Sequence, residues 1–250
     1  MFITKQKRKM GNPETEIIDW SKSDYYVIGI GNSLKEVIID LNKREYSKCE
    51  IVWIENFNDV KIPSFKFIIF LVDYIDSDIV KGIEGSYTVG NITIICSIFN
   101  IENIISKYDC ALKIRETSPY FSDVESFLDI LFKPWYIAVN EIDYLHFFAN
   151  AKKLRLFSYV IRDGSEEAYK KFDESMINAI EKLQDNQYRY VISSIYTKDG
   201  VKANSFIGSH YHSIDQKFRD EKKIETIRYY KRDPSIKDER IIVVLLLIGS

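Results

Sequence analysis

The sequence lacks three features that would assign it to large classes of proteins. Its longest apolar runs, at residues 67–72 and 241–248, are far shorter than the ~20 residues that cross a bilayer, so both are predicted to be buried strands. It has 35 basic and 37 acidic residues, a balance that gives no reason to expect nucleic acid or an anionic membrane as a partner. The three cysteines, Cys49, Cys96 and Cys110, show no paired spacing, which favours buried thiols in a reducing cytoplasm over disulfide or metal chemistry.

Signatures of catalytic and metal chemistry are also scarce. The sequence has no Gly-x-Ser-x-Gly turn and no Cys–His arrangement of recognisable spacing. His210 and His212 lie two residues apart on a predicted helix, which directs them to different faces and argues against a shared metal ion. The basic run at residues 5–9 precedes no apolar segment of signal-peptide length, so we interpret it as a solvated tail. We therefore expect no metal site and no nucleic-acid partner.

The first half of the sequence alternates apolar strands with short helices. Continuous apolar strands between helices are typical of a parallel sheet that is covered on both faces. Residues 24–134 are therefore predicted to form a Rossmann-like α/β domain, preceded by a tail at residues 1–23. Strands are predicted at 25–30, 50–56, 65–72, 92–99 and 110–116, and helices at 33–44, 76–83 and 100–109.

The second half changes character. A helix at 121–132 leads into a loop and then a long helical stretch from near Asp143, so residues 135–162 are assigned to this loop and a central helix. Asp163, Gly164 and Ser165 form a good capping sequence for the helix that follows. Residues 163–250 are predicted to form an α+β domain, with helices at 166–183 and 203–219 and strands at 188–197, 224–231 and 241–248.

Two segments of this second half resemble the bacterial tubulin homologue FtsZ. Residues 127–151, "FLDILFKPWYIAVNEIDYLHFFANA", resemble the place where an FtsZ helix ends in a basic-Pro pair and an acidic loop opens the next helix. Residues 228–249 resemble the final FtsZ strands without a gap, because Asp233, Pro234, Asp238 and Glu239 match the family's Asp-Pro-x-Leu-x-Asp-Glu turn. The order of the elements agrees too, and the resemblance covers roughly residues 24–249.

The resemblance implies a GTP-binding N-terminal domain, a long core helix and an FtsZ-type C-terminal α+β domain. In that family, subunits stack head to tail into filaments, and the acidic loop of one subunit completes the GTP-hydrolysing site of the next. The resemblance thus implies a protein partner, either a second copy of this chain or an FtsZ-like filament protein. Because the sequence ends at Gly249 and Ser250, directly after the last predicted strand, we expect no flexible tail that recruits membrane adaptors and no direct membrane anchoring.

The candidate phosphate loop follows the first strand. Phosphate binding needs backbone N–H groups that approach oxygen atoms closely, which favours successive glycines at a helix N-terminus. Gly29 and Gly31 are present, but Asn32, Ser33 and Leu34 replace the further glycines of the family. We therefore favour a tight strand-to-helix turn without a cofactor, with GTP or GDP bound at Gly29, Gly31, Asn32 and Ser33 as the alternative.

The segment after the third strand also departs from the family, which has a glycine- and threonine-rich phosphate loop there. Asp73, Asp76 and Asp78 occupy this segment, and three carboxylates would repel a triphosphate unless a metal ion intervened. Their spacing is compatible with an oxygen-ligand metal site. We prefer the interpretation that Asp76 or Ser77 caps the next helix and that the other carboxylates are solvated.

The acidic loop is incomplete. Aligned without a gap from Pro134, Asn140 and Asp143 occupy the family's two acidic positions, and in an alignment shifted by two residues Asp143 and His146 do. Either register retains one carboxylate of the pair, which puts general-base or water-positioning chemistry in doubt. Asn140 and Asp143 are thus vestigial catalytic candidates, and Asp143 is equally well interpreted as a helix cap.

Three hypotheses remain. The first is a degenerate FtsZ-like protein, bacterial and active in cell division, that has lost hydrolysis and works through protein–protein contacts. The second is a GTPase with atypical loops. The third is a Rossmann-like nucleotide sensor, in which Glu55 at the end of the second strand would bind a ribose beside Gly29 and Gly31, although Leu34 replaces the third glycine of that fingerprint. We favour the first hypothesis and do not expect an enzyme.

Overall fold

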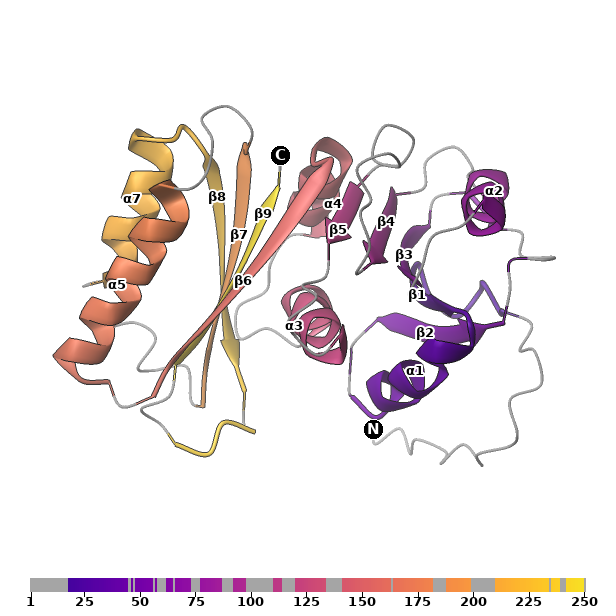
Figure 1. Cartoon of the computed structure of the whole chain (residues 1–250), viewed down its shortest axis with the longest axis horizontal. Helices are drawn as coiled ribbons and strands as arrows, with labels where there is room; N and C mark the ends of the chain where they lie inside the picture. The colour runs from indigo at the N-terminus through magenta and orange to yellow at the C-terminus, as the bar shows by residue number, and fades with distance from the viewer. Residues whose placement is uncertain are drawn as a thin grey trace, which may run out of the picture.

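The computed structural model forms one nine-stranded sheet with helices on both faces (Figure 1). Strands β1 to β6 are parallel to one another, and β9 runs antiparallel to both of its neighbours, β6 and β7. The strand order is β2-β1-β3-β4-β5-β6-β9-β7-β8. The structure describes residues 18–44, 46, 48–55, 57, 62–64, 66–72, 77–86, 92–97, 110–113, 120–133, 141–162, 164–181, 188–198, 210–233, 235–238 and 242–249.

The N-terminal half contains the predicted parallel sheet. Its strands are β1 (Tyr25–Ile30), β2 (Cys49–Ile54), β3 (Phe67–Val72), β4 (Ile92–Ser97) and β5 (Cys110–Lys113). All six residues of β3 are buried, which is expected of a strand that is covered on both faces. The connecting helices within the described residues are the 3₁₀ turn η1 (Asn32–Leu34), α1 (Lys35–Asn42) and α2 (Ser77–Ser86). The helix predicted at 100–109 lies outside the described residues.

The C-terminal half contains the predicted α+β elements. Its strands are β6 (Lys153–Ile161), β7 (Tyr190–Thr197), β8 (Glu225–Arg232) and β9 (Ile242–Gly249), and its helices are α5 (Glu166–Glu181) and α7 (His212–Asp220). The capping sequence before α5 acts as predicted, because Gly164 has a φ of 64° and the Ser165 hydroxyl accepts a 3.1 Å hydrogen bond from the N–H of Ala168.

The central helix is shorter than expected. Two helices, α3 (Tyr120–Phe132) and α4 (Glu141–Asn150), occupy the middle of the chain, and residues 153–161 form β6 instead of extending α4. The alternation at the start of Lys153–Ile161 explains the difference, because Leu154 and Leu156 are buried whereas Lys153 and Arg155 are exposed, which is the two-residue period of a strand. A ten-residue helix spans only about 15 Å, and β6 pairs directly with β5, so the two expected sheets are joined edge to edge.

Three apolar clusters form the layers of the molecule. One cluster lies on a single face of the sheet and packs α1, α3 and α4 against both halves. On the other face, α2 covers the N-terminal strands, and α5 and α7 cover the C-terminal strands (Figure 1). Cys96 is fully buried and Cys49 is half-buried, as predicted for structural thiols.

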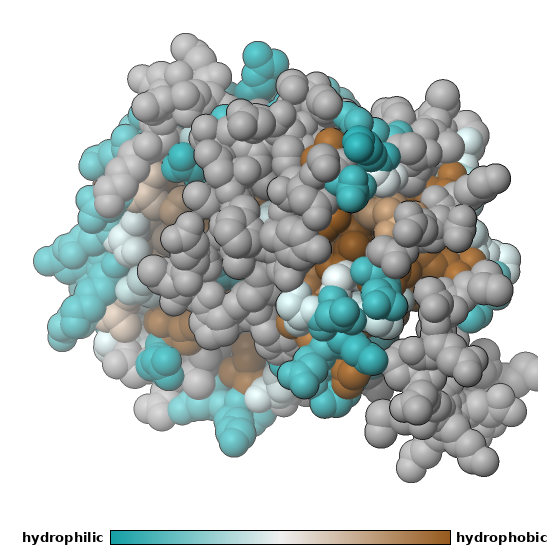
Figure 2. All heavy atoms as spheres, turned by 45° about the vertical axis from the view of Figure 1, so that its right-hand side comes forward, coloured by the Kyte–Doolittle hydropathy of each residue, from teal (hydrophilic) through white to brown (hydrophobic). Residues whose placement is uncertain are grey.

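The surface of the described residues is largely polar. Figure 2 shows hydrophobic residues of the N-terminal half beside hydrophilic ones, and the large apolar side chains most exposed in the described part of the chain are Ile39 at 44% and Val160 at 41%. None of the helices among the described residues is long and apolar enough to span a membrane.

Candidate functional site

The turn after β1 occupies the position where open α/β sheets bind ligands. β1 lies between β2 and β3, so the chain reverses its direction of travel across the sheet at the carboxyl end of β1. Ligands of such folds bind at this reversal. Gly29, Gly31, Asn32, Ser33 and Glu55 all lie at or next to this edge, because Ile30 is in register with Ile54 and Glu55 follows Ile54. The fold therefore brings the predicted cofactor-binding residues together.

Gly29 is required by packing. A Cβ atom at this position would lie 2.5 Å from Cγ1 and 2.7 Å from Cδ1 of Ile38. Ile38 is buried on α1, which crosses the sheet directly over β1. The absence of a side chain at Gly29 lets helix and strand approach closely, a role that involves no ligand.

The N–H and the carbonyl oxygen of Gly31 both form hydrogen bonds within the protein. Its φ of 96° lies in the region that favours glycine. Its N–H donates a 3.1 Å hydrogen bond to the carbonyl oxygen of Ile54. Its own carbonyl oxygen accepts bonds from the indole N–H of Trp53 at 2.8 Å and from the N–H of Leu34 at 3.2 Å. The N–H that a phosphate loop would direct at an anion thus extends the β1–β2 ladder.

The exposed side chains at this edge are polar. Asn32, Ser33 and Glu55 are exposed, and the Lys35 ammonium lies 4.9 Å from the centre of the Trp53 ring. An amide, a hydroxyl and a carboxylate at one edge can hydrogen-bond a polar molecule.

Of the two predicted catalytic residues, the structure describes the backbone of Asp143 alone, and this residue is at the other edge of the sheet. Asp143 belongs to α4, its side chain is not among those described, and Asn140 lies outside the described residues. The Phe148 ring of α4 packs against that of Phe67, the first residue of β3, with centroids 5.4 Å apart. α4 therefore packs at the amino-terminal edge of the parallel strands, opposite the Gly31 turn.

The carboxylates and histidines of the remaining predictions lie apart. Asp73 and Asp76 are outside the described residues, and Asp78 is exposed in the first turn of α2, where it pairs with Lys81 at 3.7 Å. His210 Nδ1 lies 3.1 Å from Asp173 Oδ2, whereas His212 is exposed. Within the ranges that the structure describes, no group of three or more His, Cys, Asp or Glu is placed to hold a metal ion.

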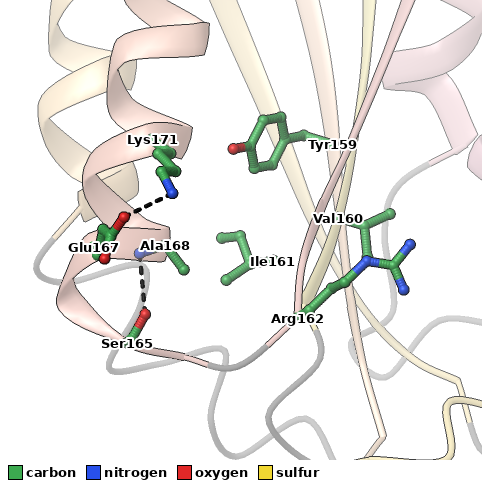
Figure 3. Close-up of a pocket in the computed structure, with 8 residues that line it drawn as sticks. All are labelled: Tyr159, Val160, Ile161, Arg162, Ser165, Glu167, Ala168 and Lys171. Atoms are coloured by element: carbon green, nitrogen blue, oxygen red, sulfur yellow. Dashed lines mark hydrogen bonds and ion pairs between the residues drawn. The ribbon is translucent and has the colours of Figure 1, made fainter.

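A small cavity of about 270 Å³ lies between the end of β6 and the first turn of α5 (Figure 3). Its polar lining residues interact with one another, since Lys171 pairs with Glu167 at 2.7 Å and Ser165 caps α5. The cavity therefore results from the way the first turn of α5 packs beside the end of β6.

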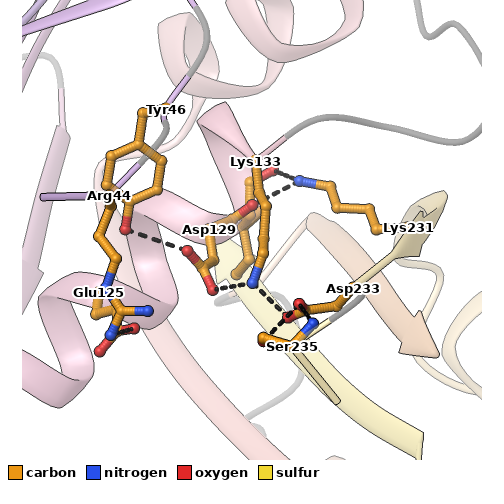
Figure 4. A network of polar contacts seen from close by, with 9 residues as sticks. Arg44, Tyr46, Glu125, Asp129, Lys133, Lys231, Asp233 and Ser235 are labelled. Carbon is orange, nitrogen blue, oxygen red and sulfur yellow. Dashed lines mark hydrogen bonds and ion pairs between the residues drawn. The ribbon is translucent and has the colours of Figure 1, made fainter. Parts of the chain in front are cut away.

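A partly buried polar network was not identifiable from the sequence. Asp129 of α3 and Lys133, the residue directly after α3, contact each other, and they contact Tyr46 on one side and Asp233 on the other (Figure 4). Burial alone would lower the pKa of Lys133, but Asp233 and Asp129 outweigh it and hold that pKa above its ordinary value. The spacing of Asp129 and Lys133, four residues apart on a predicted helix, was the available signal. This spacing gives no indication that Tyr46 and Asp233 belong to the same network.

These features define a class of protein with a Rossmann-like parallel sheet that is continued by a mixed four-stranded unit. No model of a known protein family matches the sequence, and no curated protein matches it in a sequence search. Among solved structures, the chain is similar to FtsZ from M. jannaschii, described as an empty dimer, with a TM-score of 0.64 at 10% identity over 90% of this chain and 88% of that one.

Two further solved structures are also similar to the chain over most of its length. A mutant of the same FtsZ matches with a TM-score of 0.67 at 11% identity over 92% of each chain. TubZ from Bacillus thuringiensis serovar israelensis, as GDP-form protofilaments, matches with a TM-score of 0.61 at 8% identity over 91% of this chain and 84% of that one. The protein therefore has the tubulin/FtsZ-like fold that its sequence predicted.

Proposed function

We propose that the protein is a degenerate FtsZ-like protein that does not hydrolyse GTP and acts through protein–protein contacts, by self-assembly or by binding an FtsZ-like filament protein. The engagement of Gly31 carries the proposal, because its N–H and its carbonyl oxygen both bond within the protein. The replacement of an acidic residue by Asn140 supports it. The structures named above, described as an FtsZ dimer and as TubZ protofilaments, support a filament-type partner.

Calorimetric titration with GTP, GDP, ATP and NAD, each with magnesium, tests whether the protein has lost the ability to bind a nucleotide. We expect no binding of any of the four. Micromolar binding of GTP or GDP would contradict the proposal and favour a GTPase with atypical loops, in which case GTP hydrolysis and its loss in Asp143→Ala would be measured next.

Sedimentation and negative-stain microscopy test the contact function separately. The chain alone, and the chain mixed with FtsZ filaments, would be compared with and without GTP. Assembly or co-sedimentation that is independent of GTP is the expected result. A protein that stays monomeric and fails to co-sediment would refute this part of the proposal.

A nucleotide sensor is the second candidate, and the position of Glu55 favours it. Glu55 follows β2 beside Gly31, where a carboxylate binds the ribose in dinucleotide-binding folds. Preferential binding of NAD or ATP that is lost in Glu55→Ala and retained in Glu36→Ala, an exposed glutamate of α1, would support this candidate.

A further inference from the structure

Four residues form a continuous polar path between segments that are far apart in the sequence. The Tyr46 hydroxyl, between α1 and β2, donates a 3.1 Å hydrogen bond to Oδ1 of Asp129. Oδ2 of Asp129 lies 3.3 Å from the ammonium of Lys133, four residues later and directly after the end of α3. Lys133 also donates to Oδ2 of Asp233, directly after β8 (Figure 4). We call Tyr46, Asp129, Lys133 and Asp233 the relay.

Further contacts hold α3 in its middle and at its last turn. Arg44 forms an ion pair with Glu125, one turn before Asp129 on α3. The ammonium of Lys231, which is 1% exposed, donates to the carbonyl oxygens of Asp129 at 2.6 Å and Ile130 at 2.7 Å. These carbonyls belong to the last turn of α3, where backbone acceptors have few partners within the helix, although the Asp129 carbonyl also accepts the N–H of Lys133 at 3.4 Å. α3 is thus fixed to the end of α1 on one side and to β8 on the other.

Burial makes the members of the relay interdependent. The side chains of Lys133, Asp129 and Asp233 are 22%, 18% and 11% exposed, so water screens their charges only in part. Loss of one partner from such a pair leaves an uncompensated charge, and the remaining partner then rearranges or takes up water. A change at Tyr46 therefore alters the contacts that Asp129 makes with Lys133, and through Lys133 those of Asp233.

Asp233 organises the turn that follows β8. Its Oδ1 accepts hydrogen bonds from the N–H of Ser235 at 3.0 Å and from the Ser235 hydroxyl at 2.6 Å. Its N–H donates to the carbonyl oxygen of Thr197 at 2.8 Å, and its own carbonyl accepts the N–H of Ile236 at 3.1 Å. The amide of Ser235 consequently reports whether the Asp233 carboxylate remains in place.

We propose that the relay couples the segment after α1 to the turn at residues 233–238, so that displacement of one segment loosens the other. α1 begins directly after the Gly31 turn and ends shortly before Tyr46, so the relay links the far end of α1, near the amino ends of β1 and β2, to the turn that follows β8. A protein bound at one of these surfaces changes the order of the other. This inference goes beyond the proposed function and holds whether or not a nucleotide binds.

Native-state hydrogen exchange of the full chain tests the coupling with the mild variant Tyr46→Phe. This variant removes the hydroxyl and keeps the ring that packs against Phe132 at 6.5 Å. We expect exchange at the Ser235 amide to become about three- to tenfold faster. Tyr188→Phe, on the opposite face of the sheet, is the matched control and should leave Ser235 unchanged. Unchanged exchange at Ser235 in Tyr46→Phe would overturn the proposal.

A double-mutant cycle gives a second measurement. Tyr46→Phe and Asp233→Asn should each lower the urea midpoint of unfolding, and the double variant should lower it by less than the sum, because both act on one path. The exposed Asp40 of α1, paired with Lys43, supplies the control, and Asp40→Asn should add to Asp233→Asn without coupling. Additive shifts in the relay cycle would refute the coupling.

Discussion

The indole N–H of Trp53 donates a 2.8 Å hydrogen bond to the carbonyl oxygen of Gly31 and so joins β2 to the turn after β1. The bond places a bulky aromatic side chain where the fold would otherwise present a glycine turn to a ligand. The Lys35 ammonium also lies over the Trp53 ring, 4.9 Å from the ring centre. Strand, turn and helix are thus held together by one residue.

The variant Trp53→Phe is expected to destabilise the protein by about 1–2 kcal/mol, because the Gly31 carbonyl loses a donor and the ring loses area. Urea unfolding measures the change. Trp20→Phe is the control, since Trp20 packs on Tyr26 at 4.6 Å on the other face of the sheet. A loss no larger than that of Trp20→Phe would argue against the importance of the indole bond.

The variant Gly29→Ala is expected to lower the free energy of unfolding by about 1–3 kcal/mol, because the added methyl group would lie 2.5 Å from Cγ1 of Ile38. Removal of the clashing atoms in Gly29→Ala/Ile38→Ala should make the double variant more stable than the sum of the single effects predicts. Thermal or urea unfolding of the four proteins completes the cycle. Strict additivity would show that Gly29 does not serve packing against Ile38.

Ser165→Ala should destabilise the protein by about 1 kcal/mol, because the N–H of Ala168 loses its acceptor at the start of α5. Ser165→Asp should retain most of the stability, since a carboxylate caps and also suits the positive end of the helix dipole. Ser213→Ala, on the exposed surface of α7, is the matched control for a lost hydroxyl. Equal stability of Ser165→Ala and the parent protein would contradict the capping role.

Acid should weaken the protein through Asp233. Burial alone would raise the pKa of this carboxyl, but hydrogen bonds from Lys133 and Ser235 outweigh burial and hold it below the ordinary value of 3.8. Because the unfolded state then binds the proton more tightly, the stabilisation is complete above pH 3.8 and is lost as the pH falls through the lower folded pKa. Urea midpoints measured between about pH 5 and pH 2.5 should therefore fall less steeply for Asp233→Asn than for the parent. Parallel pH profiles would be inconsistent with this account.

The arrangement of elements was largely predictable because the apolar periodicity is strong. The runs that became β3 and β9 are buried over most of their length, and Tyr211, Ile214 and Phe218, which lie in the helix predicted at 203–219, are buried three and four residues apart. The error at β6 arose from an apolar stretch that continued past α4. Its alternation in Lys153–Ile161 was the better guide, and Asn150 followed by Ala151 gave no strong stop signal.

The roles of individual site residues were less predictable. The Gly29-x-Gly31 pattern indicated a phosphate loop or a plain turn, and the choice depended on Ile38 and Trp53, whose positions follow from packing. The pairing of Lys133 with Asp233 joins residues 100 apart, a distance at which neither helical nor strand periodicity carries information. Motif and spacing thus located the edge of the sheet, whereas tertiary contacts decided its chemistry.

The insertion of β9 between β6 and β7 has a consequence for synthesis on the ribosome. β9 is the last described strand to be made, yet it pairs with β6 over Leu154–Ile161 and with β7 over Tyr190–Thr197. Until it emerges, the edges of two long apolar strands lack the partner that separates them. Such edges pair readily with other chains. The continuous sheet of the C-terminal half therefore forms only after β9 has been synthesised, and until then the facing edges of β6 and β7 are open.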